Sequence, residues 1–512
     1  MVDTHLLYRD SSTSGKKEYY SSRDLIKDLN LDILFKTMAR DDMLIYEKVK
    51  RVVMIPVLSV EDIRYRQEIY QDLYQHTELL EKLYELAEKQ NRELAKYKEN
   101  VEKGRFHSQT KIGLILEKLT YLSQGQDGLI EISKLMTAYK DRITSEGLKS
   151  FEKRLSEEPL QEIAAKLNEI QYFIADGEIG YTVKLGGGMK MEEITINYCM
   201  RDGEARSKNK PGLLKGFLSS LKKNVMYIDD NADLKDDIGA LTEAALDAVV
   251  KIFQTHLNDM VAFYDHFAEE IAFYMGVYQF MRRMGEIHIP LMLPEPLEAG
   301  SREVQFQELY ELSMAIYWHK QPVGNTISMS GTVQTLITGA NQGGKSTFLR
   351  SYGIAQVLMQ CGMPVPAGKF SAPIYHQIFT HFSRRENEKL DSGRLQEELK
   401  SMSQMVNNVV PHSLFLLNES FASTTEKEGA QIAGALLRAF REKGVTTYMV
   451  THLYQLASDL YEKQEPGIYF LVAERQENGT RTFHMIPGKP SHTSYGTDLF
   501  RKLLAEEQGG SP

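Results

Sequence analysis

A short segment in the second half of the chain has the residue types and spacing of a phosphate-binding loop. The segment reads Gly339-Ala340-Asn341-Gln342-Gly343-Gly344-Lys345-Ser346-Thr347. It fits the pattern G-x-x-x-x-G-K-[ST], in which small residues let backbone N–H groups surround phosphate oxygens. In that pattern the lysine brings positive charge to the β- and γ-phosphates, and the serine hydroxyl ligates Mg²⁺. The segment therefore predicts a site for a nucleoside triphosphate and Mg²⁺.

The sequence on both sides of this segment supports the interpretation. Residues 333–338 form an apolar run of strand length, and residues 347–361 have the pattern of a helix. A helix that begins at this point adds the positive end of its dipole at the phosphates. A chance match in irregular sequence is the alternative, and the flanking strand and helix argue against it.

Glu419 is the first candidate for a catalytic group. It ends the segment 413–419, whose residues 414–417 are apolar, and buried parallel strands have such continuous apolar runs. At the end of a strand of this kind, a Walker B strand, a carboxylate faces the metal and a glutamate orients the attacking water. Glu419 fits the second role. Asn418 stands where an aspartate is usual, and its amide oxygen can still accept a hydrogen bond from a metal-bound water. The alternative is a core strand without catalytic residues.

His452 is the second candidate, because it follows another expected strand, residues 446–450. A side chain just beyond the carboxyl end of a parallel strand lies at the ligand edge of the sheet. From there His452 would sense the γ-phosphate. A single histidine is more often an ordinary polar residue, and that alternative stays open.

The last 200 or so residues alternate between strand-length apolar runs and helix-length segments, which predicts an α/β domain. The runs lie at 333–338, 414–417, 446–450 and 468–472. Asn478-Gly479 then separates the last run from residues 482–486, a strong signal for a β-hairpin.

The first half of the chain has mainly helical patterns. Residues 61–103 form a long charged stretch without Gly or Pro, and residues 106–170 continue in short helical pieces. Residues 236–285 carry apolar side chains at three- and four-residue steps, which predicts a second long helix. Such a helix would extend about 75 Å, a length typical of a lever or of half a coiled coil. An ordinary helical bundle is the alternative, and Gly276 is a candidate break.

A small β-containing insertion is expected between these helical regions. Residues 181–185 and 194–198 are strand-like and flank the turn 186–188. Basic residues gather in the same insertion: Arg206, Lys208, Lys210, Lys215, Lys222 and Lys223. Phosphate contacts to DNA need such charge in no particular order. A solvated loop is the alternative, and acidic residues at 192–193 and 229–233 weaken the electrostatic case.

Length and composition restrict the class of protein. The chain has 512 residues, enough for two to four domains, and no apolar run long enough to span a membrane. Its N-terminal residues are polar and do not form a secretory signal. Two cysteines, Cys199 and Cys361, are too few for a disulfide framework and favour a reducing cytoplasm. The net charge of −9 means that a nucleic acid would need a local basic patch.

The order and spacing of the segments in the second half closely resemble the ATPase domain of the MutS mismatch-repair family, over roughly residues 300–500. The matching segments are Ile337–Thr347, Gly362–Ala367, Ile378–Thr380, Leu417–Glu419, Thr451-His452 and Ser494-Tyr495-Gly496. The family's own phosphate loop reads T-G-x-N-x-G-G-K-S-T. The resemblance implies ATP as the nucleotide, Mg²⁺ as the metal, ATP hydrolysis, and an ABC-like P-loop head.

The resemblance also implies a site that two subunits share. In ABC-like heads a signature serine of one subunit completes the ATP site of the other. Residues 391–398 lie where the family has an S-T-F-x-x-E segment, so Ser392 matches its serine and Glu397 its glutamate, without the Thr-Phe pair. Asn325 resembles the asparagine of a P-N-D segment near the adenine. A homodimer is therefore expected, with ATP-dependent assembly as one form of it.

The helical half resembles the family less specifically. Asp62, Arg66 and Gln67 fit a D-x-x-x-R-Q segment that opens a long helix in the MutS core. Residues 236–285 then match the family's second lever, and the insertion takes the place of its DNA clamp. The expected domains are a flexible N-terminus (1–22), a helical core and lever (23–174), the insertion (175–235), a lever helix (236–287), the ATPase domain (288–500) and a short tail (501–512).

Departures from the family bear on function. The sequence has no room for the mismatch-reading domain with its F-x-E motif, for the connector domain, or for a small nuclease domain, and the C-terminal dimerisation element is at best truncated. Direct recognition of mismatches is therefore not expected. The first hypothesis is an ATP-dependent DNA clamp acting in repair or recombination. The second is a nucleotide-gated scaffold that binds protein, which the acidic net charge favours.

Overall fold

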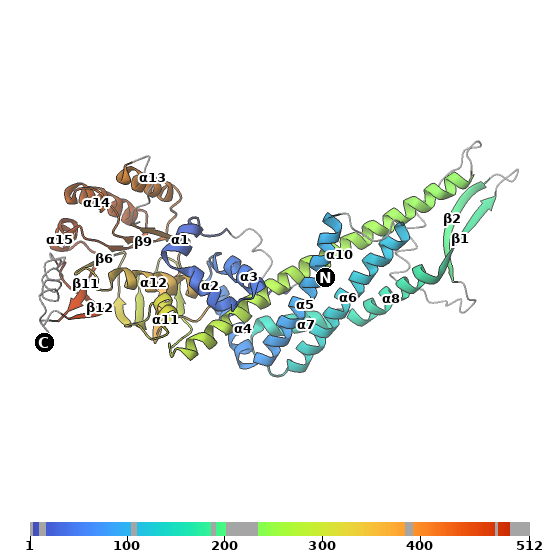
Figure 1. Ribbon diagram of the computed structural model, residues 1–512, viewed down its shortest axis with the longest axis horizontal. Helices are drawn as coiled ribbons and strands as arrows, with labels where there is room; N and C mark the ends of the chain where they lie inside the picture. The colour runs from blue at the N-terminus through green and yellow to red at the C-terminus, as the bar shows by residue number, and fades with distance from the viewer. Residues whose placement is uncertain are drawn as a thin grey trace, which may run out of the picture. The chain divides into compact units, whose positions relative to one another are not determined.

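The computed structural model of the protein describes residues 4–9, 17–103, 110–185, 191–200, 234–383, 393–476 and 480–491. The chain divides into two compact units, each made from two stretches of sequence. Unit 1 comprises Met1–His5 and Gln75–Ile271, and unit 2 comprises Leu6–Tyr74 and Ala272–Pro512. Unit 1 is mainly helical and unit 2 contains the α/β part (Figure 1).

A mixed six-stranded sheet forms the centre of unit 2. Its order is β12-β11-β6-β10-β9-β8. The strands are β6 (Gln334–Thr338), β8 (Ile378–Phe382), β9 (Leu414–Asn418), β10 (Thr446–Val450), β11 (Ile468–Arg475) and β12 (Arg481–Pro487). The neighbours pair in parallel except β12, which is antiparallel to β11. The strands expected from the apolar runs are therefore confirmed. The hairpin of β11 and β12 is confirmed too, although Asn478-Gly479 lies outside the described residues.

Helices cover both faces of this sheet because its strands are apolar on both faces. They are α12 (Lys345–Gln360), α13 (Arg394–Val406), α14 (Glu426–Glu442) and α15 (Tyr454–Glu462). Tyr448 of β10 stacks on Tyr352 of α12 with ring centroids 4.4 Å apart. The next residue, Met449, points the other way and joins a cluster with Met402, Phe440 and Leu456 of α13, α14 and α15. Figure 1 shows α12 and α13–α14 on opposite sides of the strands.

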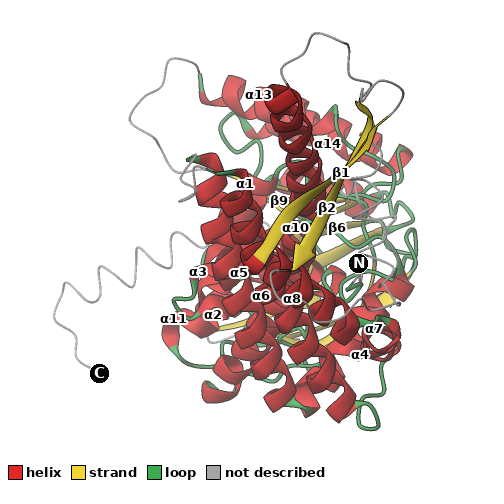
Figure 2. Cartoon of the chain, turned by 90° about the vertical axis from the view of Figure 1, so that its right-hand side faces the viewer, coloured by secondary structure: helices red, strands yellow, loops and turns green. Residues whose placement is uncertain are grey.

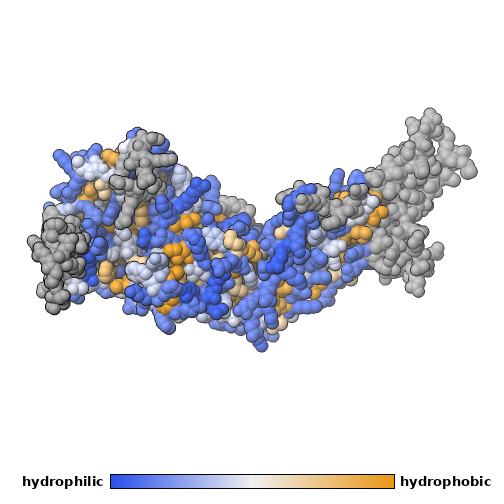
Figure 3. Space-filling model, in the orientation of Figure 1, coloured by the Kyte–Doolittle hydropathy of each residue, from blue (hydrophilic) through white to orange (hydrophobic). Residues whose placement is uncertain are grey.

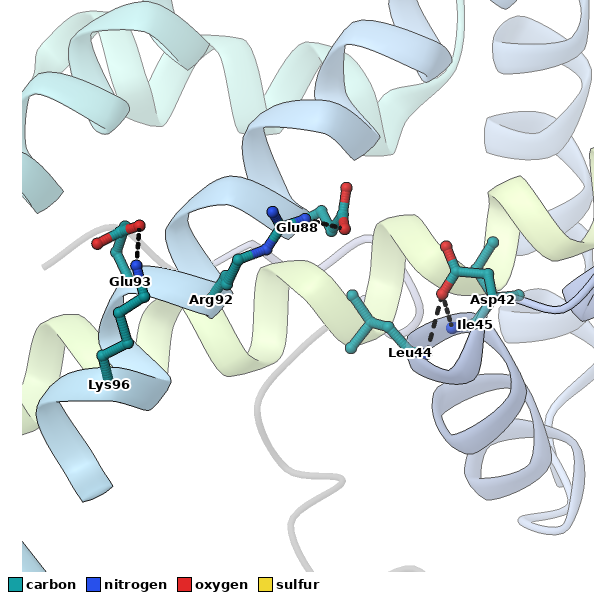
Figure 4. Close-up of polar contacts among 7 residues, drawn as sticks. All are labelled: Asp42, Leu44, Ile45, Glu88, Arg92, Glu93 and Lys96. Atoms are coloured by element: carbon teal, nitrogen blue, oxygen red, sulfur yellow. Dashed lines mark hydrogen bonds and ion pairs between the residues drawn. The ribbon is translucent and has the colours of Figure 1, made fainter.

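A second sheet and the N-terminal helices complete unit 2. The sheet has the order β3-β7-β4-β5, with β3 (Glu295–Leu297), β4 (Val304–Leu309), β5 (Asn325–Met329) and β7 (Lys369–Pro373). The helices are α1 (Ser22–Asp28), α2 (Leu31–Ala39), α3 (Met43–Val53), α4 (Val60–Gln75) and α11 (Leu312–Trp318). Asp42 caps α3, because its carboxylate accepts from the N–H groups of Leu44 at 2.9 Å and Ile45 at 3.1 Å (Figure 4).

Arg66 connects α4 to the C-terminal end of α12. Its side chain is fully buried, its Nε donates to Leu7 O at 2.7 Å, and its Nη1 donates to the carbonyl of Cys361, the C-cap of α12, at 3.4 Å. A cation at a helix C-terminus interacts favourably with the helix dipole. Gln67 adds a bond from its Nε2 to Pro294 O at 2.9 Å. Burial raises the pKa of Cys361 to about 12, so its thiol stays protonated.

The described residues of unit 1 form mainly helices and an antiparallel pair of strands. Its elements are α5 (Thr77–Glu102), α6 (Lys111–Tyr139), α7 (Glu146–Glu157), α8 (Leu160–Asp176), β1 (Gly177–Leu185) and β2 (Met191–Met200). The antiparallel β1–β2 pair confirms the strand-like pieces predicted there, and Figure 2 shows it in yellow. Apolar side chains of α5, α6, α8 and α10 form a common core: Tyr97, Ile115, Leu119, Leu122, Ile170, Val249, Phe253 and Leu257.

Residues 61–103 are helical but form two helices, because α4 ends at Gln75 and α5 begins at Thr77. Neither Gly nor Pro marks this break; the carbonyl of His76 instead accepts from Leu79 and Leu80 at the start of α5, and its ring packs on Tyr139. The prediction of short helical pieces over residues 106–170 was wrong, since α6 alone has 29 residues.

Helix α10 confirms the second long helix. It runs from Leu234 to Glu286 as 53 residues; those up to Ile271 belong to unit 1 and those from Ala272 to unit 2. Gly276 is not a break. A Cβ atom at Gly276 would lie 2.7 Å from Val49 Cγ2 and 3.2 Å from Ile45 Cγ2, so the glycine allows α10 to approach α3 closely.

The surface is mainly hydrophilic on the face that Figure 3 shows. Exposed helix faces carry ion pairs between neighbouring turns, such as Glu88 with Arg92 and Glu93 with Lys96 at 2.8 Å on α5 (Figure 4). Exposed pairs of this kind contribute little to stability. Within the described residues, no helix combines the length and apolarity needed to cross a lipid bilayer.

Candidate active site

Three strands bring the candidate residues to one edge of the central sheet. β10 lies between β6 and β9, and Val450 at its end pairs with Ile337 on one side and with Asn418 on the other. Since all three strands are parallel, the segments after Thr338, Asn418 and Val450 leave the sheet at the same edge. Ligands of open α/β sheets bind outside this carboxyl edge.

The segment from Gly339 to Gly344 is a tight loop between β6 and α12, as the flanking strand and helix predicted. The backbone is left-handed at Gly339 (φ 113°), Gln342 (φ 59°) and Gly344 (φ 91°). Glycine adopts such values without steric cost, which explains its place at both ends of the loop. Gly344 caps α12, so the free N–H groups of the helix's first turn face the edge of the sheet.

Lys345 is directed into this loop. Its Nζ donates to the carbonyl oxygens of Gly339 and Ala340, each at 2.9 Å, and the residue is only 5% exposed. Burial lowers the pKa of Lys345, and the negative charge of Glu419 partly opposes that effect. The ammonium group therefore sits in a place that disfavours its charge. A polyanion bound at the loop would relieve that penalty.

Ser346 and Asn418 meet across the edge. The Ser346 hydroxyl donates to Asn418 Oδ1 at 2.7 Å. Both are neutral oxygen donors of the hard type that Mg²⁺ prefers, and Mg²⁺ completes its octahedron with waters and substrate phosphate oxygens. The donor set thus fits a magnesium ion that arrives with a nucleotide, although Asn418 supplies no charge to it.

Glu419 and His452 form a hydrogen-bonded pair. Glu419 Oε1 lies 3.1 Å from His452 Nε2, and this hydrogen bond is the main reason that the pKa of Glu419 is lowered. Glu419 has a φ of 56°, a left-handed conformation that is strained for a residue with a side chain. Its N–H donates to Val450 O at 2.9 Å, which joins the ends of β9 and β10. The carboxylate is thus ionised and oriented at neutral pH.

Asn325 lies at the start of β5, and its side chain forms hydrogen bonds with the backbone of β12. Its Oδ1 accepts from the N–H of Met485 at 2.7 Å, and its Nδ2 donates to Phe483 O at 3.5 Å. Both ends of the amide are therefore used by the backbone of β12. Its location near an adenine stays a prediction.

Phe483 and Arg481 of β12 lie beside the phosphate loop, and no sequence pattern predicted this position. Phe483 is 45% exposed and has a φ of 64°, and a Cβ atom at Gly344 would lie 3.5 Å from Phe483 Cβ. Arg481 Nη1 donates to Gln342 Oε1 at 3.2 Å. An exposed aromatic ring at this position can stack on a nucleotide base.

Some predicted site residues lie outside the described residues. They are Ser392 and the basic residues Arg206, Lys208, Lys210, Lys215, Lys222 and Lys223. The segment Ser494-Tyr495-Gly496 lies outside them as well. The roles given to all of these residues stay predictions.

Two family models match separate parts of the chain. A family model described as MutS domain V matches residues 335–505, and one described as MutS2 N-terminal domain matches residues 59–287. An endonuclease MutS2 from Gemmatimonas aurantiaca is 26% identical over 182 residues, and one from Pediococcus pentosaceus is 26% identical over 242 residues. A DNA mismatch repair protein MutS from Petrotoga mobilis is 30% identical over 167 residues.

Each match covers only part of this chain and only part of the relative. They cover 35%, 46% and 32% of this chain and 22%, 30% and 20% of the respective relatives. The matched part therefore spans less than a third of each relative's length.

Proposed function

The chain belongs to the MutS family, and from that premise we propose that it binds ATP with Mg²⁺ at the carboxyl edge of β6, β9 and β10 and hydrolyses it. The observation that carries the proposal is the convergence of three pairs at one edge. These are Lys345 with the phosphate loop, Ser346 with Asn418, and Glu419 with His452.

Each side chain has a separate task in this proposal. Lys345 exchanges its two carbonyl partners for β- and γ-phosphate oxygens, and the first N–H groups of α12 donate to the same phosphates. Ser346 and Asn418 hold Mg²⁺, which neutralises phosphate charge when it is bound. Phe483 stacks on the base.

Hydrolysis requires a water molecule that is oriented toward the γ-phosphate, and Glu419 is the group that orients it. Its carboxylate accepts a hydrogen bond from the water and takes its proton as the oxygen attacks the γ-phosphorus, while the bond from that phosphorus to the bridging oxygen breaks and ADP leaves. His452 holds that carboxylate in place through Nε2. His452 also lies at the strand end from which it can contact the γ-phosphate.

Replacing Asn418 with aspartate tests the metal assignment. The new carboxylate would still accept from Ser346 and would add a negative charge beside Mg²⁺. We expect the Mg²⁺ concentration for half-maximal hydrolysis to fall by about tenfold, the equivalent of about 1.4 kcal/mol. The measurement is an Mg²⁺ titration of ATPase rate, with Asn407→Asp, an exposed change of the same chemistry, as control. An unchanged titration would place residue 418 away from the metal.

We further propose that the ATPase acts on DNA, as an ATP-dependent clamp. The relatives are described as an endonuclease and as DNA mismatch repair proteins, and the basic insertion supplies charge for phosphate contacts. The competing proposal is a nucleotide-gated scaffold that binds protein, which the net charge of −9 favours. DNA affinity that falls steeply with salt supports the clamp, because each phosphate contact releases counterions.

Removing charge at Lys208, Lys210, Lys222 and Lys223 together is expected to weaken DNA binding and flatten its salt dependence. Each lost phosphate contact lowers the slope of log affinity against log salt by about one. Fluorescence anisotropy with duplex DNA at several salt concentrations measures both quantities. A matched control removes four exposed lysines elsewhere: Lys82, Lys153, Lys443 and Lys463. If the two quadruple variants behave alike, the insertion does not contact DNA.

A further inference from the structure

The loop between β9 and α14, residues 419–425, is strained at two positions. Glu419 has a φ of 56° and Phe421 a φ of 64°, and neither residue is glycine. Side chains disfavour this left-handed conformation, so it persists only where the surroundings determine it. The orientation of the Glu419 carboxylate therefore depends on what holds the loop from outside.

Contacts from two neighbours hold the first half of this loop. The hydroxyl of Ser420 lies 2.7 Å from His381 Nδ1 and donates to His381 O at 3.2 Å, which fixes it to β8. Gly429 of α14 packs directly on the loop, since a Cβ atom there would lie 2.6 Å from Phe421 O. The ring of Phe421 is buried in the core beneath.

Glu398 of α13 holds the second half. Its Oε1 accepts from the N–H of Phe421 at 2.5 Å, and its Oε2 accepts from the Ser423 hydroxyl at 2.6 Å. An ionised carboxylate is an acceptor at both oxygens, so it is suited to two donors from one loop. The first of these donors is the N–H of a strained residue, two positions after Glu419. The contacts of Lys345 and Ser346 do not include Glu398.

We propose that Glu398 is a positioning residue for hydrolysis: it fixes the backbone after β9 so that the Glu419 carboxylate meets His452 and the attacking water. This inference rests on the ATPase activity proposed above. It assigns the position to Glu398 rather than to its neighbour Glu397, which the family pattern matched. Lys345 and Ser346 are positioned by their bonds to Gly339, Ala340 and Asn418, and Glu398 takes no part in these bonds. A change at Glu398 therefore affects the rate of hydrolysis and leaves ATP binding unchanged.

Two substitutions separate this role from general stabilisation. Glu398→Ala removes both acceptors. Glu398→Gln keeps a carbonyl oxygen for Phe421 N–H, and its amide group can donate to the Ser423 oxygen. We expect kcat to fall on the order of 10- to 100-fold in the alanine variant, as for a small misplacement of a catalytic group. The glutamine variant should recover most of that loss.

The experiment measures kcat, the Kd for ATP and the thermal midpoint for each variant, with the exposed Lys400→Gln on the same helix as control. Loss of kcat in Glu398→Ala at constant Kd, with recovery in Glu398→Gln, supports the proposal. Hydrolysis that continues unchanged in Glu398→Ala overturns it and leaves the ATPase proposal intact. An equal loss of kcat and ATP affinity, or no recovery with glutamine, also overturns it. Absence of hydrolysis in the unsubstituted protein would overturn the ATPase proposal, and this inference with it.

Discussion

Replacing Lys345 with alanine is expected to abolish ATP binding while unit 2 stays folded. The ammonium group is the cation placed inside the phosphate loop, 2.9 Å from two of its carbonyl oxygens. Charged hydrogen bonds to phosphate contribute roughly 1.5–3 kcal/mol each, so losing two of them lowers affinity by orders of magnitude. The fold should tolerate the change, because burial lowers the pKa of Lys345 and so disfavours its charged form.

Isothermal titration calorimetry with ATP and Mg²⁺ measures this loss, and circular dichroism checks the fold. Lys427→Ala is the matched control, since it removes an exposed lysine from α14 in the same unit. A folded Lys345→Ala protein with its nucleotide affinity intact would refute the phosphate-loop assignment.

Glu419→Gln should bind ATP normally and hydrolyse it about 10²- to 10⁴-fold more slowly, the usual contribution of a general base. The amide keeps the size of the side chain and a hydrogen bond to His452, but it cannot take a proton from water. In the parent protein the bond from His452 lowers the pKa of Glu419, so the basic form prevails at neutral pH.

Phosphate release under single-turnover conditions measures the chemical step apart from binding. Glu462→Gln changes an exposed glutamate on α15 and should leave the rate unchanged. Equal rates in the Glu419 variant and the parent would mean that another residue orients the water. The slow variant also retains ATP, so light scattering on it tests the ATP-dependent homodimer that the family resemblance leads us to expect.

The sequence predicted those parts of the site that local pattern determines. The phosphate loop, the strand before it and the helix after it are contiguous, and each apolar run became a strand because both faces of the sheet are buried. Parallel strands then bring Asn418 and His452 to the edge beside Ser346. This prediction needs only the rule that the carboxyl ends of parallel strands lie at the same edge of the sheet.

Contacts between segments far apart in sequence could not be predicted in this way. Arg481 and Gln342 are separated by 139 residues, and only the folded hairpin brings β12 to the loop. Glu398 and Glu397 are adjacent, polar and helical, so their spacing does not show which one meets the loop after β9. Gly276 illustrates the same limit, because the sequence cannot distinguish a glycine that breaks a helix from one that lets a neighbouring helix approach.

The assembly of unit 2 from two distant stretches limits how the region that matches domain V could be transferred between proteins. The domain V match begins at residue 335, yet α12 depends on the N-terminal stretch: Val57 N–H donates to Gln360 O at 3.3 Å, and Arg66 closes the same helix end. A recombination event that joined a foreign gene at the domain V boundary would lose these partners and leave a buried helix end exposed. We therefore expect the region that matches domain V to need the N-terminal helices of unit 2 for its stability.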